Sequence, residues 1–343
     1  MKALVLKEYN KFIYTDVPDP VIGQDEVMVR IKACAICGSD VHGMDGSTGR
    51  RIPPIIMGHE ASGIIEMTGA KVKNLRTGDR VTFDSTIYCR RCHYCYQGKI
   101  NLCENRKVMG VSCAEYRFNG AFAEYIAVPE HILYRLPDNV SFEQAAMTEP
   151  LSVAYHAVGR IGTGKSGNAV VIGAGVIGLL IIQLLKKSRS ARITVLDKIG
   201  KKLETARYFG ADDTFLPDDP GMISKIMKAA GGRGTDVVFD AVGAASTVSM
   251  GIMLLGKGGT LVMVGNLSQS VTLPLQSVVT REISLFGSCA SAGEYPACLK
   301  LIADGEADVG KMISAAVPLS EGAKWFDRLH SGDPDLIKVI LKP

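Results

Sequence analysis

Three glycines, Gly173, Gly175 and Gly178, follow an apolar run at 169–172 and open a segment with helical spacing. Glycine here permits a tight turn, lets a ligand approach the backbone and allows the helix to pack closely on the strand. Free N–H groups at the start of such a helix favour an anion such as a pyrophosphate. Since GxGxxG spacings arise by chance in a chain with 37 glycines, the alternative is a turn that only packs helix on sheet. The strand before the turn and the helix after it favour a dinucleotide site.

An acidic residue follows the glycine turn at the distance that a ribose requires. Asp197 ends the next apolar run, nineteen residues after Gly178. Its carboxylate can bind both hydroxyls of an adenosine ribose and would repel a 2′-phosphate. NAD is therefore favoured over NADP, although a basic side chain such as the neighbouring Lys198 can tolerate a phosphate.

The pattern of apolar residues changes near residue 150. Before it, short runs such as 27–31 and 122–128 alternate with polar residues between Gly and Pro, which is typical of an all-β, barrel-like unit. From 151, apolar strands alternate with helix-length segments, which predicts an α/β unit with a parallel sheet. After about 287 the sequence becomes helical and ends in an expected strand at 336–341. The expected strands of the parallel sheet are 169–172, 193–196, 236–239 and 260–264, and its expected helices are 179–187, 201–209 and 221–230.

Composition argues against several classes of protein. With 39 Lys and Arg against 35 Asp and Glu, the net charge of +4 is small and spread out, so no nucleic acid is expected as a partner. The longest near-apolar run, 169–182, contains three glycines and is shorter than the roughly 20 residues of a membrane-spanning helix. The first residues also lack the apolar core of a signal peptide, so a cytoplasmic location is expected.

Four of the nine cysteines crowd into fifteen residues as Cys89, Cys92, Cys95 and Cys103. Four thiolates at these spacings can surround one tetrahedral zinc ion with no position left open for chemistry. Arg90, Arg91 and Lys99 lie among them and can offset the negative charge of such a centre. An iron–sulfur cluster and a redox pair are the alternatives, and ligand geometry favours zinc.

A second group of metal-binding residue types lies at 37–42 and 58–63. Cys37, His59 and Glu60 together offer a thiolate, an imidazole and a carboxylate. Each alone has an ordinary explanation, since Cys37 could be an inert buried thiol and His59 a core histidine. Cys34 and Cys37 could also form a redox pair, although no thioredoxin-like pattern surrounds them.

These motifs together resemble the zinc-dependent medium-chain alcohol dehydrogenases over essentially the whole chain. The resemblance rests on the segment from Gly58 to Gly63 followed by Gly69 and Val72, the four-cysteine lobe, Gly78-Asp79-Arg80-Val81 and the half that contains Asp197. Within that family the chain is most similar to the polyol dehydrogenases, such as the sorbitol, L-iditol, galactitol-phosphate and threonine enzymes. The fold implied is a Rossmann domain inserted in a GroES-like β-barrel catalytic domain. Its expected parts are a catalytic domain at 1–150 with a zinc lobe at about 86–108, an NAD-binding domain at 151–287 and a return segment at 288–343.

The resemblance also implies roles for individual residues. Cys37 and His59 match ligands of a catalytic zinc, Glu60 matches the third ligand of polyol-type members, and Glu149 stands where other members place a second cysteine. Ser39 matches the hydroxyl that receives the substrate proton, and His42 the residue that passes it to solvent. Two zinc ions per chain and NAD are therefore expected. The residues expected at the cofactor are Gly173, Gly175, Val176, Ile177, Gly178, Asp197, Lys202, Val242, Val264 and Gly265.

A charge count bears on Glu149. Zn²⁺ with Cys37 and Glu60 is neutral, whereas Glu149 as a further ligand makes the centre negative and weakens its Lewis acidity. We therefore expect Glu149 to bind the metal weakly and to exchange with water or substrate.

The substrate implied is a polyol-like molecule with a secondary hydroxyl. Sorbitol itself is in doubt, because 287–292 lacks the Arg–Tyr pair that sorbitol dehydrogenases place there. Arg50 and Arg51 could meet a phosphate or carboxylate on a substrate, although general exposure favours two solvated loop arginines. A threonine-type amino-alcohol dehydrogenase and a non-catalytic NAD-binding relative are the alternatives, and a homo-oligomer, dimer or tetramer, is expected from the family.

Overall fold

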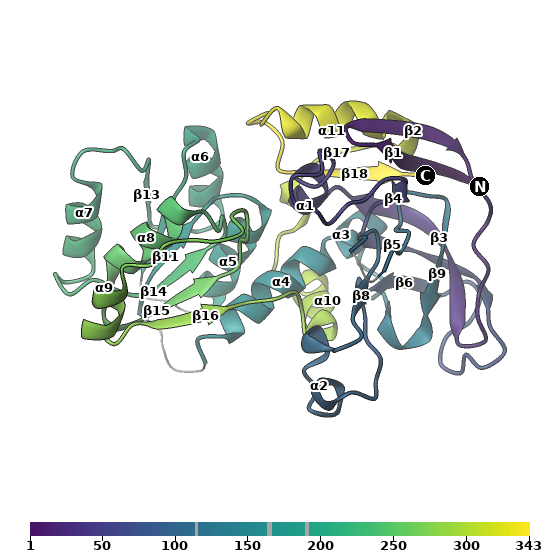
Figure 1. Cartoon of the computed structure of the whole chain (residues 1–343), viewed down its shortest axis with the longest axis horizontal. Coiled ribbons are helices and arrows are strands. Elements are labelled where there is room, and N and C mark those ends of the chain that lie inside the picture. Colours follow the sequence, from purple (N-terminus) through teal and green to yellow (C-terminus); the bar gives the residue numbers. More distant parts are fainter. Residues whose placement is uncertain (114–115, 163–166, 189–191) are drawn as a thin grey trace. The chain divides into compact units, whose positions relative to one another are not determined.

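The chain divides into two compact units, each with its own core of buried side chains. The computed structural model describes residues 1–113, 116–162, 167–188 and 192–343. Unit 1 consists of Met1–Ser152 and Ser291–Pro343, and unit 2 of Val153–Ala290. The first unit is thus built from both ends of the chain, and Figure 1 shows both termini in it. The domain boundaries expected after 150 and 287 lie two and three residues before these divisions and stay predictions.

Unit 1 consists mainly of short strands. Its longest strand, β3 (Glu26–Ala35), alternates between buried and half-buried residues along most of its length, as a strand does when one face covers a core. The other strands are β1 (Lys2–Glu8), β2 (Lys11–Asp16), β4 (Ile55–Ile56), β5 (Glu60–Thr68), β6 (Arg80–Phe83), β7 (Thr86–Ile87), β8 (Lys107–Val108), β9 (Tyr125–Pro129), β10 (Leu133–Arg135), β17 (Ile313–Pro318) and β18 (Lys338–Lys342). The helices are α1 (Gly38–Val41), α2 (His93–Tyr96), α3 (Phe142–Ala146), α4 (Thr148–Gly159), which continues into unit 2, α10 (Tyr295–Ala303) and α11 (Gly322–His330), with 3₁₀ turns at Ile100–Leu102, Glu130–Ile132, Gly310–Met312 and Leu319–Glu321.

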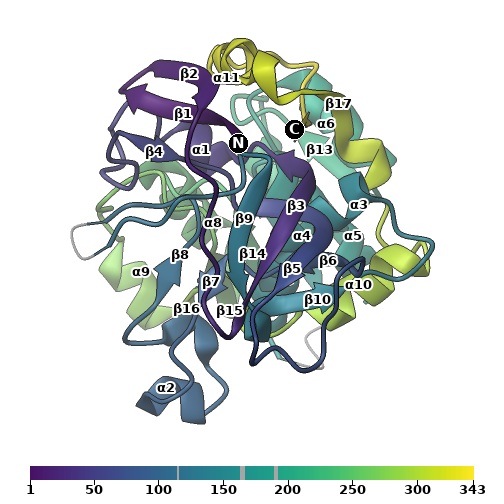
Figure 2. The same ribbon diagram turned by 90° about the vertical axis from the view of Figure 1, so that its right-hand side faces the viewer.

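The main sheet of unit 1 is organised around β3. The strand order is β10-β6-β5-β3-β18-β17, and β9 also pairs with β3, next to which it lies in Figure 2. β3 thus meets β5 on one side, and on the other it meets β9 along its first half and β18 at its end. The last strand of the chain therefore completes a sheet begun by residues near its start.

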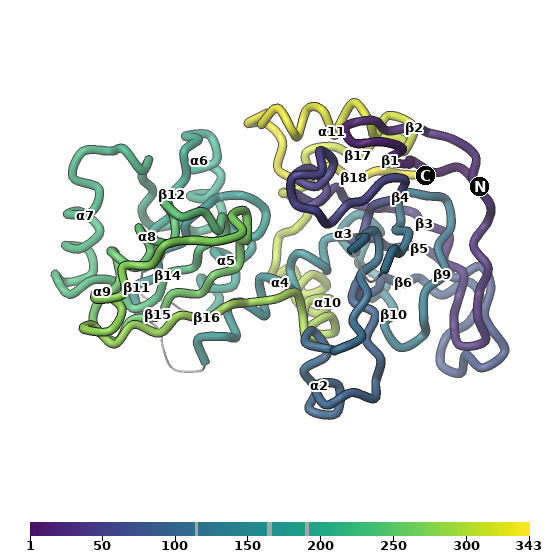
Figure 3. Tube along the Cα trace, in the orientation of Figure 1, coloured from purple at the N-terminus to yellow at the C-terminus, as the bar shows by residue number. Residues whose placement is uncertain are grey.

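A further contact joins the two chain ends. β1 and β2 form a hairpin, and β4 extends it to a three-stranded sheet. The Phe12 ring of this hairpin stacks on the Phe326 ring of α11 with centroids 4.4 Å apart. In Figure 3 the late α11 lies along the early β2, as these ring contacts require.

Unit 2 contains the parallel sheet expected from the glycine motif. The strand order is β13-β12-β11-β14-β15-β16 and every pair is parallel. The order reverses direction between β11 and β14, so the carboxyl ends of these two strands flank the position where doubly wound sheets bind ligands. The strands are β11 (Asn168–Ile172), β12 (Arg192–Leu196), β13 (Asp213–Phe215), β14 (Thr235–Asp240), β15 (Leu255–Met263) and β16 (Ser284–Gly287), and the helices are α5 (Val176–Lys187), α6 (Gly200–Tyr208), α7 (Met222–Ala229), α8 (Ala245–Leu254) and α9 (Leu275–Thr280).

Some expected bounds were wrong. In the run at 122–128 the strand begins only at Tyr125. The Phe122 N–H donates to the Met57 carbonyl oxygen, and Ala123 forms an isolated β-bridge with Ala3, so neither residue belongs to a continuous ladder. The final strand begins at Lys338 and not at 336. Strand β17 was not expected, since its residues alternate between half-buried and exposed without a clear apolar face. Among the described residues, no helix is both long and apolar enough to cross a bilayer.

Candidate functional site

Strand register brings the predicted metal-binding residues together. Glu60 opens β5 and pairs with Ala35, the last residue of β3, only two residues before Cys37. His59 precedes Glu60 and so lies beside the same strand end, while Cys37 is the N-cap of α1. The loop after β3 and the start of β5 therefore meet, although 22 positions separate Cys37 from His59.

The donor atoms of Cys37, His59 and Glu60 fit one metal ion. One donor atom from each lies within 4.8 Å of the others. His59 and Glu60 are buried, and Glu60 Oε1 has no hydrogen-bond partner among the described residues. A buried carboxylate oxygen without a partner is costly unless a ligand satisfies it. Thiolate, imidazole and carboxylate are the donors that zinc takes in proteins, so this set fits a zinc ion.

A buried carboxylate supports the imidazole. Asp40 Oδ1 lies 3.5 Å from His59 Nδ1, and both side chains are buried. Burial by itself lowers the pKa of His59, but the negative charges of Asp40 and Cys37 raise that pKa well above its usual value. The imidazole is thus held in a strongly anionic environment that favours a cation at its other nitrogen.

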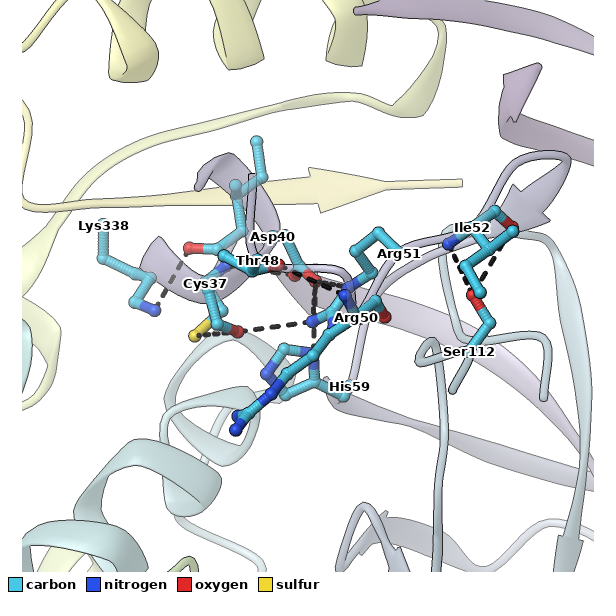
Figure 4. A network of polar contacts seen from close by, with 11 residues as sticks. Cys37, Asp40, Thr48, Arg50, Arg51, Ile52, His59, Ser112 and Lys338 are labelled. Atoms are coloured by element: carbon cyan, nitrogen blue, oxygen red, sulfur yellow. Dashed lines mark hydrogen bonds and ion pairs between the residues drawn. The ribbon is translucent and has the colours of Figure 1, made fainter. Parts of the chain in front are cut away.

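The Asp40 carboxylate is itself paired with Arg51. Arg51 Nη2 and Nε donate to Asp40 Oδ1 at 2.7 and 3.1 Å, and only 3% of Arg51 is exposed. Burial would raise the pKa of Asp40, but His59 and Arg51 beside it hold that pKa below its usual range. In the view of Figure 4, Asp40 and Arg51 lie to the right of Cys37 and above His59. The expectation of two solvated arginines is therefore correct for the exposed Arg50 and wrong for Arg51.

The carboxylate of Glu60 also has a buried cationic partner. Lys338, the first residue of β18, donates from Nζ to Glu60 Oε2 at 2.6 Å and to the Ile36 carbonyl oxygen at 3.1 Å. Burial lowers the pKa of Lys338, but the Glu60 carboxylate beside it raises that pKa above its usual value, so this lysine is charged. Oε2 of Glu60 is thus paired with the ammonium group of Lys338, while Oε1 remains available to bind a metal ion.

The remaining residues predicted for this site, Ser39, His42 and Glu149, differ in how they contact the cluster of Cys37, His59 and Glu60. Ser39 Oγ donates to Cys37 Sγ at 3.3 Å. His42 is the C-cap of α1 and is exposed, and no hydrogen bond joins it to Ser39 in the described part of the chain. Glu149, in the first turn of α4, is not among the donor atoms grouped within 4.8 Å. Burial raises the pKa of Glu149 to about 8. The charge of His59 lowers this pKa and that of Glu60 raises it, so Glu149 interacts electrostatically with two residues of the cluster.

The four-cysteine segment forms a closed second cluster. All four Sγ atoms lie within 4.8 Å of one another, with Cys92 and Cys95 3.5 Å apart. The Cys89 backbone N–H donates to Cys103 Sγ at 3.2 Å, and the pairing of β7 with β8 closes the segment at its base. Cysteine thiols at such spacing fit a tetrahedral zinc ion without an open position. The backbone N–H of Arg91 lowers the pKa of Cys89 to about 6, which favours the thiolate that binds metal.

The glycine turn of unit 2 is tightly packed at its first and third glycines and open at the middle one. Gly173 has a φ of +98°, and a Cβ on Gly178 would lie 1.8 Å from the Gly173 carbonyl oxygen. A Cβ on Gly175, the N-cap of α5, would meet nothing within 4 Å. The first and third glycines are thus required by packing, while the middle one faces open space.

Other residues expected at the cofactor surround this turn. Asp197 accepts from the backbone N–H groups of Ala174 at 2.7 Å and Ile199 at 2.9 Å, so it also holds the glycine turn in place. Val242 packs against Gly173, and a Cβ on Gly265 would lie 2.3 Å from the Val242 backbone. Val264 donates its N–H to the Asp240 carbonyl oxygen. The half-buried Lys202 lies on α6, and its backbone N–H donates to the Ile199 carbonyl oxygen at 3.0 Å.

Sequence reasoning missed Asp40 and Lys338. Asp40 lies inside the motif from Cys37 to His42, and its position in the sequence does not show that it faces His59. Lys338 interrupts the apolar run at 336–341, and a charged residue within a buried strand is the indication that could have revealed it. Its partner lies 278 positions away.

Comparison with known proteins assigns both units. Residues 23–138 match the family described as alcohol dehydrogenase GroES-like domain, and residues 176–304 match the family described as zinc-binding dehydrogenase. D-xylulose reductase A from Aspergillus oryzae is 33% identical over 339 residues, covering 96% of this chain and 94% of the relative. The chain belongs to the zinc-dependent medium-chain polyol dehydrogenase family.

Two further relatives bear on this dehydrogenase. L-idonate 5-dehydrogenase from Vitis vinifera is 36% identical over 310 residues, covering 88% of this chain and 83% of the relative. A zinc-binding dehydrogenase from Sinorhizobium meliloti, solved with NADP bound, has 30% identity and a TM-score of 0.91, covering 100% of this chain and 99% of that one. The expected fold, a Rossmann unit and a GroES-like unit, is confirmed.

Proposed function

We propose that this enzyme oxidises a secondary hydroxyl of a polyol, a polyol phosphate or a related sugar acid to a ketone, with NAD⁺ as the hydride acceptor. The observation that carries the proposal is the cluster of Cys37, His59 and Glu60, in which one buried carboxylate oxygen has no hydrogen-bond partner among the residues that the structure describes. The names of the D-xylulose reductase and L-idonate dehydrogenase relatives support a substrate derived from a sugar.

The chain's own residues hold and deprotonate the substrate. Cys37, His59 and Glu60 would hold the catalytic zinc, with Glu149 as a weaker ligand, and Cys89, Cys92, Cys95 and Cys103 the structural zinc. When bound, zinc supplies a Lewis acid that makes an alcohol more acidic, and the nicotinamide ring supplies the hydride acceptor. Ser39, held beside Cys37, would accept the hydroxyl proton as it releases its own, and the exposed His42 would pass the released proton to solvent.

Asp197 supports NAD⁺ in preference to NADP⁺. Its carboxylate stands at the end of β12 beside the glycine turn, where a 2′-phosphate would add a second negative charge. The NADP-bound relative shows that this fold also accommodates the phosphate, so the preference is tested directly. Replacing Asp197 by Ser (D197S) is expected to lower the ratio of kcat/KM for NAD⁺ over NADP⁺ by at least about tenfold.

A substrate screen tests the reaction. NADH formation is followed with neutral polyols, polyol phosphates, aldonic acids and L-threonine, using the wild type and the C37A and H59A variants. We expect turnover on a polyol-derived substrate that both substitutions abolish, while NAD⁺ affinity and the fold persist. Turnover of L-threonine alone would establish the amino-alcohol alternative, and no turnover of any class would favour a non-catalytic NAD-binding protein.

We further propose a cytoplasmic homo-oligomer, either a dimer or a tetramer. Members of this family commonly form such assemblies, and reducing conditions such as those of the cytoplasm favour four clustered cysteines that remain thiolates. Light scattering should give two or four times the chain mass of 36.7 kDa. A monomer would contradict the oligomer, and recovery of the protein outside the cytoplasm in cell fractionation would contradict the location.

A further inference from the structure

One buried arginine contacts two different parts of the candidate site. Arg51 Nη2 lies 2.7 Å from Asp40 Oδ1 and 3.3 Å from Ser39 Oγ, to which it donates. Its Nη1 donates to the Arg50 carbonyl oxygen at 3.2 Å, which fixes the guanidinium against its own loop. Since all three nitrogens of the planar guanidinium are used, the group has a single orientation.

The contact with Asp40 leads to a metal ligand. Asp40 Oδ1 receives Arg51 and faces His59 Nδ1, while Asp40 Oδ2 accepts from the Cys37 backbone N–H at 3.4 Å. Two of the three metal-binding residues thus depend on the position of one carboxylate. Groups that orient metal ligands through such contacts affect metal affinity by about 10- to 100-fold.

The contact with Ser39 leads to the proton acceptor. Ser39 is exposed, and its Oγ donates to Cys37 Sγ while it accepts from Arg51 Nη2. An exposed serine hydroxyl rotates freely unless contacts on two sides hold it. Arg51 therefore supplies the second contact that keeps the Ser39 oxygen at the metal site.

We propose that Arg51 is a positioning residue that couples the metal-binding and proton-accepting halves of this site. It orients His59 through Asp40 and holds Ser39 directly, without touching the substrate. The inference rests on the proposed function for the role of Ser39, but the metal-binding half stands independently of any substrate.

Two substitutions separate the halves. Methionine in R51M removes all the donors, whereas lysine in R51K keeps one charge, which can reach Asp40 but cannot also hold Ser39. The control is R328M, because Arg328 Nε and Nη2 likewise donate to a single oxygen of Asp333, at 3.2 and 2.7 Å, on α11. The C37A variant identifies the zinc that remains in the four-cysteine cluster.

Zinc release to a chelator tests the first half. R51M is expected to lose the zinc of the Cys37 site at least about tenfold faster than the wild type, while the other zinc and the R328M protein are unchanged. R51K is expected to retain zinc within about threefold of the wild type. Wild-type release from R51M would overturn the proposal, and if R51M does not fold, R51K together with the kinetic experiment decides.

Steady-state kinetics test the second half. R51K is expected to lower kcat about tenfold with the KM for NAD⁺ unchanged, and the same substitution in an S39A background is expected to change kcat by less than about threefold. Equal effects of R51K in both backgrounds, or no effect in either, would overturn the proposal. If the wild type oxidises no alcohol, the proposed function fails, whereas zinc release still tests Arg51.

Discussion

At the scale of single residues, Lys338 changes how the charge of the metal site is counted. Zinc with Cys37, Glu60 and Glu149 carries one excess negative charge, but the buried Lys338 beside Glu60 restores neutrality. Asp40 and Arg51 cancel one another in the same shell. The reason to expect only weak binding by Glu149 is thereby reduced, and its place among the ligands stays a prediction.

The Lys338–Glu60 pair gives a prediction on stability. K338M leaves an unpaired buried carboxylate, which is expected to lower the free energy of unfolding by about 3–5 kcal/mol. The double variant K338M/E60Q, which removes both charges, should recover most of this loss. Chemical denaturation of apo and zinc-loaded protein measures both, and a K338M midpoint equal to that of the wild type would contradict the importance of the pair.

Arg50 gives a prediction on substrate choice. Its side chain is exposed, makes no hydrogen bond or ion pair in the described residues and runs past His59 in the view of Figure 4. A free guanidinium there suits a carboxylate or phosphate on the substrate. R50Q should raise the KM for an aldonic acid or a polyol phosphate about tenfold and leave that for neutral polyols unchanged. Equal effects on charged and neutral substrates would rule out this role.

At the scale of elements, the end of β6 anchors the segment that returns to unit 1. Asp84 directly follows this strand and is buried, and its Oδ2 accepts from Ser291 Oγ at 2.8 Å. Its Oδ1 accepts from the Thr86 backbone N–H at 2.8 Å. Ser291 is the first residue of the returning segment, so one carboxylate ties two distant stretches of chain together.

Asp84 also gives a prediction on pH dependence. Burial raises its pKa to about 6 from 3.8, despite the bonds from Thr86 and Ser291. Between these values the folded protein binds more protons than the unfolded chain, so the free energy of unfolding falls as pH rises, by at most about 3 kcal/mol. In D84N this pH-dependent contribution to the free energy of unfolding is absent, while the amide oxygen and nitrogen can still form hydrogen bonds with Thr86 and Ser291. The Tm of D84N relative to the wild type should therefore rise from pH 4 to 7. The exposed-site variant D138N provides the control, and a constant difference for D84N would contradict the assignment.

At the scale of the whole molecule, the sequence predicts those features that depend on residues close together in the chain. The glycine turn, the alternation of strands and helices in unit 2 and the two groups of metal-binding residues each depend on neighbours within a few positions. The pairing of β18 with β3 depends on residues about 300 positions apart and has no local pattern. For the same reason Lys338 was not predicted as the partner of Glu60, while Glu60 itself was predicted at the metal site.

Removal of β18 tests whether unit 1 depends on this distant strand while unit 2 does not. A chain that ends at residue 335 lacks β18 and Lys338, so β3 and β17 lose a partner and Glu60 loses its cation. We expect this chain to lose the zinc of the Cys37 site and all activity, yet to bind NADH, because unit 2 has its own core. Removal of the exposed Pro343 alone is the control, and retention of activity by the shorter chain would contradict the prediction.

The position of Lys338 has a consequence for biosynthesis. As the chain leaves the ribosome, residues 1–152 emerge first but lack the strand and the ammonium group that complete their sheet. Unit 2, whose strands are all contiguous in the sequence, can fold meanwhile. The earlier segment must therefore wait with Glu60 unpaired until Lys338 has been made. We expect a chain whose synthesis stops before Lys338 to bind its nucleotide and to catalyse nothing.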